Sequence, residues 1–279
     1  MARGLRLRLK EDELRRLYQV EKRSLEDIAR LYGASRVAVW KYCGSLGLTM
    51  RNRSDARLEA QKRGKVPQGY FDINEGFFKK WSPNMAYVLG LLITDGNVSN
   101  NGTVSLCMNE KELIEKVAKA MGAEHKITLS KHQKGLFIFH FARASMVKDL
   151  GALCVVPRKS MTVKFPLIPE PFLADFIRGV FDGDGSVFFN SSKKHPVQTK
   201  FVSSSKEFIE KLESELRKLG LPARKIYGQP TKNGITHMFK YSHKDSEKLF
   251  AVMYKDIKNS LFLARKYNKF LAGFNKQEG

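Results

Sequence analysis

The chain has 279 residues, 42% of them hydrophobic and 11% aromatic, which is enough to build a core and excludes a disordered polymer. Its 50 Lys and Arg against 28 Asp and Glu leave a formal charge of +22, which favours a polyanionic partner such as nucleic acid. The three cysteines are widely spaced and form no Cys-x-x-Cys pair, which excludes a disulfide framework and a thiolate zinc site.

Neither a membrane anchor nor a secretion signal is expected from the sequence. No apolar run approaches the roughly 20 residues that cross a bilayer. The basic residues 1–10 also lack the apolar centre of a signal peptide. We therefore expect a protein of the cytoplasm, associated with the nucleoid, or of an organelle, without membrane contact and not secreted. A highly soluble or ribosome-associated protein is the alternative explanation of the charge.

The first helical periodicity lies in the N-terminal part of the chain. Ala29 is small enough for two helices to approach, and Gly33 suits a turn between them. The core shared by both helices would consist of Ile28, Val39 and Tyr42. This pattern predicts a small all-α domain with a helix-turn-helix over residues 1–50.

The second helix of this motif would carry the contacts with DNA. Ser24 and Asp27 resemble a capping pair for the first helix, and Ser35 suits the N-cap of the second. In a major groove, the exposed face of the second helix would present Ser35, Arg36, Val37, Trp40 and Lys41. A plain helical hairpin without DNA contact is the alternative, because short motifs of this kind often occur by chance.

Residues 51–80 are expected to form a basic linker. Their first two thirds have almost no apolar periodicity and end in a stretch that contains Pro and Gly. The Lys and Arg side chains of this segment would follow phosphates between two DNA-bound modules. A merely solvated tether is equally compatible with the composition.

After the linker the sequence repeats itself, and this repeat predicts the architecture. SPNMAYVLGLLITDGNV in the first copy and EPFLADFIRGVFDGDGSV in the second each give a helix that ends in Asp-Gly. SLCMNEKELIEK and KFVSSSKEFIEK then each give a strand, a polar cap and an amphipathic helix. We therefore expect an α+β core with two α-β-β-α-β-β-α units, over residues 81–166 and 167–279, related by a pseudo-twofold axis.

The repeat places one acid at the same point of each copy, Asp95 and Asp184. Two such acids can meet at the axis if their helices pack closely, which Gly90 and Gly179 on the helix interface would allow. Duplex DNA has a similar twofold, and cutting both strands requires a metal-holding carboxylate for each scissile phosphate. This pair of acids is therefore our candidate for a catalytic, metal-binding centre.

The two helix ends also carry a family signature. VLGLLITDG at 88–96 and IRGVFDGDG at 177–185 resemble the two motifs of the LAGLIDADG homing endonucleases. The second copy is a close match, whereas the first carries Ile93 where the second has Asp182. Because Asp182 stands earlier in its motif than the final acid, it is expected to be a structural or cap residue.

The resemblance implies a metal site and its ligands. In this family the last acid of each motif coordinates a divalent metal, which implies that Asp95 and Asp184 bind Mg²⁺. Mn²⁺ or Ca²⁺ would substitute for binding. The main-chain carbonyls of Thr94 and Gly183, one residue before each acid, are expected to help as ligands.

The family resemblance also implies a basic residue near each acid. The repeat matches Lys159 with Lys266, which are our candidates for the catalytic lysines. Lys164 and Lys269 are the nearby competitors. Any single lysine in so basic a chain can instead contact a phosphate or water.

The resemblance further implies that each half forms a curved antiparallel sheet, and that the two sheets form a saddle lying along the major groove. If the side chains of the first strands alternate, the positions facing DNA are Asn97, Ser99 and Asn101 in one half and Ser186, Phe188 and Asn190 in the other. A register error of one residue would reverse all of them.

These features together predict a site-specific endonuclease that hydrolyses one phosphodiester in each strand of a long double-stranded DNA site. Two motifs in one chain supply the twofold that single-motif relatives obtain by dimerising, so we expect a monomer without an obligate protein partner. A non-cleaving DNA-binding transcriptional regulator and an intron RNA maturase are the alternatives on the same scaffold. No Cys or Ser opens the chain and no His-Asn pair closes it, so a free-standing or intron-encoded protein is expected rather than an intein-embedded one.

Overall fold

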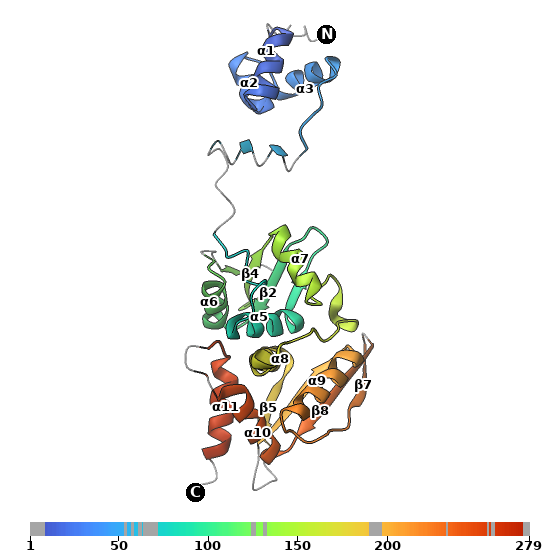
Figure 1. Cartoon of the computed structure of the whole chain (residues 1–279). Coiled ribbons are helices and arrows are strands. Elements are labelled where there is room, and N and C mark those ends of the chain that lie inside the picture. The colour runs from blue at the N-terminus through green and yellow to red at the C-terminus, as the bar shows by residue number, and fades with distance from the viewer. Residues whose placement is uncertain are drawn as a thin grey trace. The chain divides into compact units, whose positions relative to one another are not determined.

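The computed structural model describes residues 9–52, 55–56, 59–60, 63, 72–123, 127–130, 133–189, 197–232, 234–255, 257 and 260–275. The chain divides into two compact units, Met1–Phe71 and Asp72–Gly279 (Figure 1). Each unit has a hydrophobic core of its own. Within the described ranges, no helix combines the length and the apolar character needed to cross a membrane.

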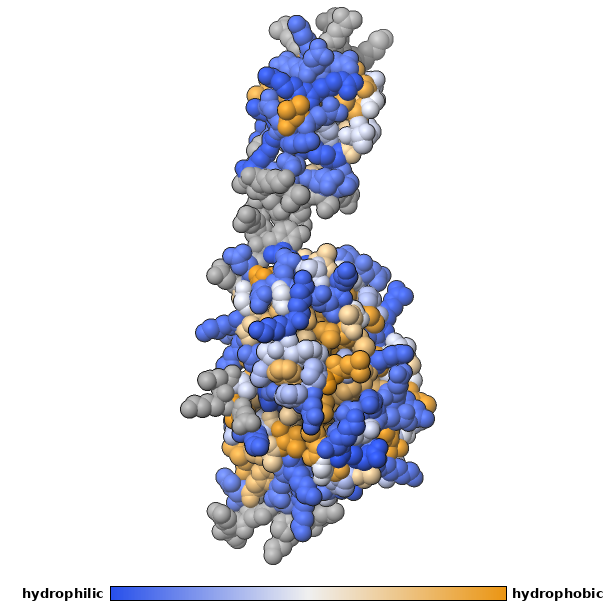
Figure 2. All heavy atoms as spheres, viewed as in Figure 1, coloured by the Kyte–Doolittle hydropathy of each residue, from blue (hydrophilic) through white to orange (hydrophobic). Residues whose placement is uncertain are grey.

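The first unit is built of short helices: α1 Glu11–Arg15, η1 Arg16–Val20, α2 Leu25–Leu31 and α3 Arg36–Ser45. Ile28 and Val39 are fully buried in its core, and Tyr42 packs against that core while half-buried. Gly33 has a φ of 62°, a left-handed conformation that glycine adopts at little cost. The two helices and the glycine turn expected here are therefore present. Hydrophilic residues cover most of the face of this unit that Figure 2 displays.

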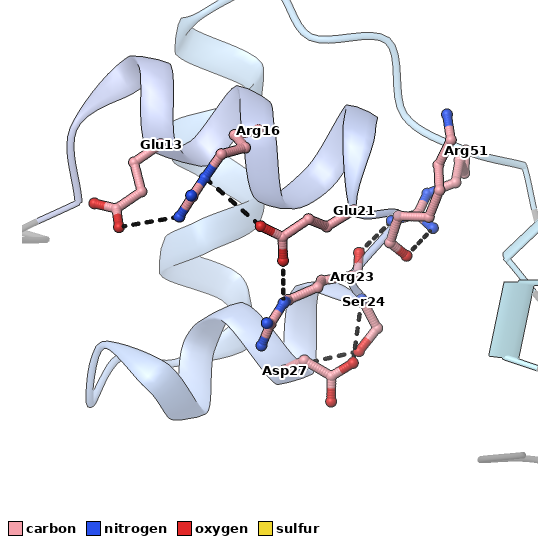
Figure 3. A network of polar contacts seen from close by, with 8 residues as sticks. Glu13, Arg16, Glu21, Arg23, Ser24, Asp27 and Arg51 are labelled. Atoms are coloured by element: carbon pink, nitrogen blue, oxygen red, sulfur yellow. Dashed lines mark hydrogen bonds and ion pairs between the residues drawn. The ribbon is translucent and has the colours of Figure 1, made fainter. Parts of the chain in front are cut away.

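Side-chain caps begin both helices of the pair, and Figure 3 shows the cap of α2. The Ser24 hydroxyl accepts from the Asp27 amide at 3.1 Å, and the Asp27 carboxylate accepts from the Ser24 amide at 3.3 Å. In α3 the Ser35 hydroxyl accepts a 3.1 Å hydrogen bond from the Ala38 amide. These contacts satisfy amide groups that the first helical turn leaves unpaired, and they confirm the predicted caps.

Arg51 links the chain after α3 to the segment just before α2 by hydrogen bonds (Figure 3). Its guanidinium group donates to the carbonyl oxygens of Lys22, at 2.7 Å, and Arg23, and it stacks 4.3 Å from the centre of the Tyr18 ring. The Arg51 amide also donates to the Tyr18 hydroxyl at 3.0 Å. The folded part of the first unit therefore includes residues that were expected at the start of the linker.

The second unit contains the repeated architecture that the sequence predicts. The first copy consists of α5 Pro83–Thr94, β1 Gly96–Val98, β2 Val104–Met108, α6 Lys111–Ala120, β3 Thr128–Leu129, β4 Phe137–Phe141 and α7 Ala144–Ala152, followed by η2 Lys159–Met161. The second consists of η3 Glu170–Phe172, α8 Leu173–Asp184, β5 Ser186–Phe189, β6 Val197–Ser203, α9 Lys206–Lys218, β7 Tyr227–Thr231, β8 Gly234–Tyr241 and α10 His243–Tyr254, followed by α11 Ala264–Phe274. The α-β-β-α-β-β-α order is confirmed in both copies.

Each copy forms one antiparallel four-stranded sheet, in the orders β1-β2-β4-β3 and β5-β6-β8-β7. Side chains alternate along the strands, as in β2, where Val104 and Leu106 are buried and Ser105 is half-exposed. Each sheet therefore has one face in the core and one open face. The helices α5 and α8 lie next to each other where the two copies meet (Figure 1).

Three local features differ from the expectation. The linker is shorter than 51–80, because Phe77 and Phe78 are buried in the core of the second unit. Strand β1 ends at Val98, because the chain already turns back at the Ser99 amide, which donates to the Thr103 carbonyl at 2.9 Å. Finally, the second motif begins with the 3-10 turn η3, which contains Pro171, and the α-helix α8 starts only at Leu173.

Candidate active site at the paired helices

The helices α5 and α8 approach until their backbones touch. A Cβ atom added to Gly90 would lie 2.5 Å from the carbonyl oxygen of Phe176. One added to Gly179 would lie 2.1 Å from the carbonyl oxygen of Tyr87 and 3.1 Å from the Cα of Gly90. No real Cβ sits that close to a neighbouring backbone, so any side chain at these two positions would force the helices apart.

Close packing continues to the ends of the two helices, where the acids lie. A Cβ on Gly183 would lie 1.9 Å from the Thr94 hydroxyl and 3.0 Å from a carboxylate oxygen of Asp95. Asp95 is the C-cap residue of α5, and Asp184 is the last residue of α8. The helix pair therefore brings the two acids to the same end of its interface.

The environment of these acids opposes their negative charge. Burial, and after it the charge of Asp184, raises the pKa of Asp95 to about 6. Desolvation by the surrounding protein likewise raises the pKa of Asp184 above its ordinary value, although the residue is exposed. The ammonium groups of Lys266 and Lys159 act in the opposite direction on both acids. Asp95 is half-buried and Asp184 is exposed, and a bound cation would offset the repulsion between their charges.

The two predicted lysines occupy equivalent places beside the acids. Lys266 is buried at the start of α11, and its ammonium group donates to the carbonyl oxygens of Phe181, Asp182, Gly183 and Gly185, at 2.7, 2.7, 3.1 and 2.6 Å. Lys159 is buried in η2 and donates to the carbonyl oxygen of Gly96. Gly96 and Gly185 each follow one of the acids, so both lysines contact the same point of the repeat.

Burial has consequences for the charge of these lysines. It lowers the pKa of Lys266 to about 8, and it also lowers the pKa of Lys159. The competitors Lys164 and Lys269 are exposed, and the Lys269 ammonium lies 5.6 Å from the centre of the Phe189 ring. Only the first pair contacts the chain beside the acids.

Asp182 is a buried structural residue at the same interface, as expected. Its carboxylate accepts hydrogen bonds from the Tyr87 hydroxyl at 2.8 Å and from the Leu263 amide at 2.7 Å. It therefore joins α5 to the segment that leads into α11 and Lys266. The matching residue of the first copy, Ile93, is buried among apolar side chains.

The ligands available to a metal ion are oxygens. Among the described residues, no group of three or more His, Cys, Asp and Glu side chains is arranged to hold an ion. A cation at this place would therefore take Asp95, Asp184 and main-chain oxygens, a donor set that suits hard ions such as Mg²⁺. The Gly183 carbonyl already accepts from Lys266 at 3.1 Å, which leaves it one lone pair for an ion.

The strand register decides which side chains share the open face of each sheet. Asn97 pairs with Ser105, which pairs with His140, so these three form one row across the first sheet. Ser99 and Asn101 lie in the turn after β1, where the Ser99 hydroxyl hydrogen-bonds to the Thr103 carbonyl at 3.0 Å. Of the three contact residues expected in the first half, only Asn97 therefore lies on a strand, and it shares its row with Ser105 and His140.

In the second sheet the corresponding row is basic. Ser186 pairs with Lys200, which pairs with Lys240, and Phe188 pairs with Gln198 on the same face. Asn190 lies outside the described residues. The sequence offered the alternation of each strand but not the pairing between strands, which is why Lys200, Lys240 and Gln198 were missed, along with Ser105 and His140 of the first sheet.

The expected contact residues of the first unit are all exposed. They are Ser35, Arg36, Val37, Trp40 and Lys41, on or just before α3. Trp40 is 54% exposed and Val37 is 59% exposed, which is high for large apolar side chains. This face of α3 therefore lies largely open at the surface of the first unit.

Comparison with known proteins identifies residues 171–253 as a LAGLIDADG-like domain. A curated relative, the probable translation initiation factor IF-2 of Methanocaldococcus jannaschii, is 27% identical over 168 residues, which are 58% of this chain and only 13% of that protein. Among solved structures, a mesophilic variant from the homing endonuclease I-DmoI is similar, with a TM-score of 0.47 and 16% identity, over 69% of this chain and 97% of that one.

Two further solved structures give similar figures. The homing endonuclease I-WcaI bound to its DNA recognition sequence has a TM-score of 0.46 and 14% identity, over 70% of this chain and 91% of that one. Full-length WhiA from Thermotoga maritima has a TM-score of 0.46 and 12% identity, over 73% of this chain and 65% of that one.

Proposed function

We propose that this chain, a LAGLIDADG protein through its residues 171–253, is a metal-dependent, site-specific endonuclease of double-stranded DNA that acts as a monomer. One observation carries the proposal. Two acids and two buried lysines, one of each from each copy, gather at the end of a glycine-packed helix pair. A pseudo-twofold site of this kind matches the two antiparallel strands of a duplex.

The acids Asp95 and Asp184, helped by the carbonyl oxygens of Thr94 and Gly183, would hold the divalent ion. We expect Mg²⁺ in the cell, with Mn²⁺ or Ca²⁺ able to replace it for binding. When bound, such an ion supplies positive charge that lowers the pKa of a coordinated water and offsets the charge developing on a scissile phosphate. Two features of the protein favour a bound cation here: the raised pKa of Asp95, and the like charge of Asp184 that contributes to it.

Lys159 and Lys266 would position the reacting groups. Each ammonium is held on main-chain carbonyls next to an acid, so its position is set before DNA binds. At neutral pH Lys266 keeps its charge, because its pKa is about 8. A fixed positive charge there would attract the scissile phosphate, while the main-chain carbonyls occupy the three N–H donors of Lys266.

Recognition of the DNA would use both units. The open faces of the two sheets carry the rows that contain Asn97 and Ser186, together with Phe188 in the second sheet. The exposed face of α3, with Arg36 and Trp40, would enter a major groove beside the cleavage site. The formal charge of +22 supplies the salt-dependent attraction to phosphates that both contacts require.

The test is to incubate the protein with Mg²⁺ and a randomised duplex library and to sequence the ends that it produces. Asp95→Asn and Asp184→Asn, singly and together, should bind the same site without cutting at least one strand. Glu112→Gln is the matched control, because it removes one negative charge from an exposed position of α6. It should cut as the unchanged protein does.

The outcomes separate the competing functions. Cuts at one long site, absent from the double variant, would support the endonuclease and identify its target, which in a homing context is the insertion site of the element that encodes it. Specific retention of duplex without cuts would favour a DNA-binding transcriptional regulator. Retention of structured RNA instead of duplex would favour an intron maturase.

A further inference from the structure

The exposed face of α3 is apolar at its centre. Val37 and Trp40 are 59% and 54% exposed, and their spacing of three residues places them side by side on the helix surface. Gly44, one turn further on, is also exposed and adds no side chain to this face. Val39 and Cys43, on the opposite side of the helix, are fully buried in the core. Val37 and Trp40 therefore form an apolar strip on the side of α3 that faces away from its own unit.

The polar side chains of α3 limit the bases that this helix can recognise. Its sequence contains no Asn, Gln, Asp or Glu. Bidentate recognition of adenine requires an amide side chain, and a carboxylate is the usual acceptor for the amino group of cytosine. The hydroxyl groups of Ser35 and Ser45 already make hydrogen bonds within the helix. Two kinds of contact remain, guanine with Arg36 or Lys41, and an apolar group with the strip.

Thymine is the base that offers such an apolar group in the major groove. Its 5-methyl group projects into the groove, where the other three bases present only hydrogen-bond donors and acceptors. Three residues of an α-helix rise about 4.5 Å, and successive base pairs of DNA rise about 3.4 Å. Val37 and Trp40, on a helix that lies in the groove, therefore suit the methyl groups of two neighbouring base pairs.

The charges around the strip favour DNA as its partner. Arg36 and Lys41 are exposed on the same helix, and α3 carries no acidic residue. Residues 1–71 contain 17 Lys and Arg against 8 Asp and Glu. Phosphates border the base edges of a major groove, so an apolar strip with cations beside it complements that groove.

We propose that α3 recognises thymine through its 5-methyl group, and that Val37 and Trp40 contact the methyl groups of two neighbouring base pairs in the target. This inference rests on the proposed binding of DNA by the first unit, and it does not depend on cleavage. Arg36 and Lys41 would contact the phosphates on either side and so hold the helix in the groove.

The test measures the affinity of the full chain for a duplex that is selected from a randomised library by binding in Ca²⁺, a selection that requires no cutting. Footprints of the unchanged protein and of the double variant Arg36→Ala/Trp40→Ala locate the part of the site that α3 covers. Each thymine in that part is then replaced in turn by deoxyuridine, which lacks only the methyl group. Two neighbouring replacements should each weaken binding by about fourfold.

Single substitutions connect each methyl group with one side chain. Val37→Ala and Trp40→Ala should each remove the preference for thymine over deoxyuridine at one of the two positions, because the contact is already lost. Both side chains are exposed, so both variants should fold. Val20→Ala is the matched control, since it shortens an exposed valine of the same unit outside α3. It should keep both fourfold effects.

Three outcomes would overturn the inference. The first is an affinity that no deoxyuridine replacement changes, and the second is a methyl effect that persists in both Val37→Ala and Trp40→Ala. The third is self-association of the unchanged protein that Trp40→Ala abolishes, seen by sedimentation, because the strip would then be a contact between copies. A double variant that protects the full length of DNA would instead show that the first unit does not bind DNA through α3, and both that proposal and this inference would fail.

Discussion

The ammonium group of Lys266 donates a 2.6 Å hydrogen bond to the carbonyl oxygen of Gly185, the residue that follows the second acid. Lys159 makes the same contact with Gly96 in the first copy. If these lysines orient water or phosphate, Lys159→Met and Lys266→Met should each reduce single-turnover cleavage by about 10²–10⁴-fold. The measurement is the cleavage rate at saturating protein, because it separates chemistry from binding.

Lys164→Met and Lys269→Met are the matched controls for that prediction. Both lysines are exposed and lie close in sequence to the buried pair. Their loss should weaken DNA binding slightly and reduce its salt dependence, without a comparable effect on the rate in the bound complex. A larger loss of rate at these exposed positions would assign the catalytic role to them instead.

Gly179→Ala should destabilise the second unit by about 1–3 kcal/mol or more, because its Cβ would meet the Tyr87 carbonyl at 2.1 Å. The separation of the helices should also displace the acids, so cleavage should fall even in protein that remains folded. Gly151→Ala is the control within α7, where an added Cβ meets nothing within 4 Å. It should stabilise by up to about 1 kcal/mol. Thermal unfolding that ranks the two variants equally would contradict this account of the helix crossing.

Asp95→Asn should stabilise the metal-free protein at neutral pH. The folded state holds the pKa of Asp95 at about 6, above the ordinary value of 3.8, so it disfavours the charged form. The contribution of this group to stability is therefore fully present below about pH 4 and is lost as the pH rises through about 6. After allowance for solvent screening, the variant should gain on the order of 1–2 kcal/mol at pH 7.5 and about half as much at pH 5.

Unfolding of both proteins in a chelator, at the two pH values, checks that prediction. Comparing the variant with the unchanged protein at each pH removes the effect of the large net charge. Ca²⁺ should then raise the midpoint of the unchanged protein more than that of the variant. An equal gain in stability at both pH values would mean that the folded state does not raise the pKa of Asp95.

Arg36→Ala combined with Trp40→Ala should shorten the protected footprint on the target and lower affinity, with the cleavage position unchanged. Trp40 is 54% exposed on α3, so its removal should cost little folding stability. Footprinting in Ca²⁺ gives the length of DNA covered. Arg30→Ala is the control, since it removes a charge from an exposed position of α2. If the double variant keeps the full footprint, α3 is not the recognition helix.

The order of elements and the place of the acids could be predicted because the repeat encodes them locally. The cap at Ser82, the proline at the first helical position and the final Asp-Gly are all visible within one stretch of sequence, and the structure has the hydrogen bond from Met85 to Ser82 at 3.2 Å. The close contact between α5 and α8 could be inferred in the same way, because Gly90 and Gly179 stand at the same point of the two copies.

Features that depend on distant partners were not predictable. The Asp182 carboxylate accepts from Tyr87 and from the Leu263 amide, which are far from it in sequence. Strand β1 ends at Val98, three residues before Asn101, the last position that simple alternation suggests, since the turn at Ser99 is fixed by its contacts with Thr103. A hollow lined by Thr94 and Ser160 of the first copy and by Asp184 and Ser203 of the second likewise depends on residues far apart in sequence, and no local pattern reveals it.

The rows of side chains on the two open faces differ in chemistry. One contains Asn97, Ser105 and His140, and the other contains Ser186, Lys200 and Lys240. A palindromic duplex presents the same pattern of base edges twice, so it would suit one sheet and not the other. If the chain reads DNA through these rows, its preferred target is not a palindrome. A substitution in either sheet then changes one arm of that target while the other arm keeps its sequence.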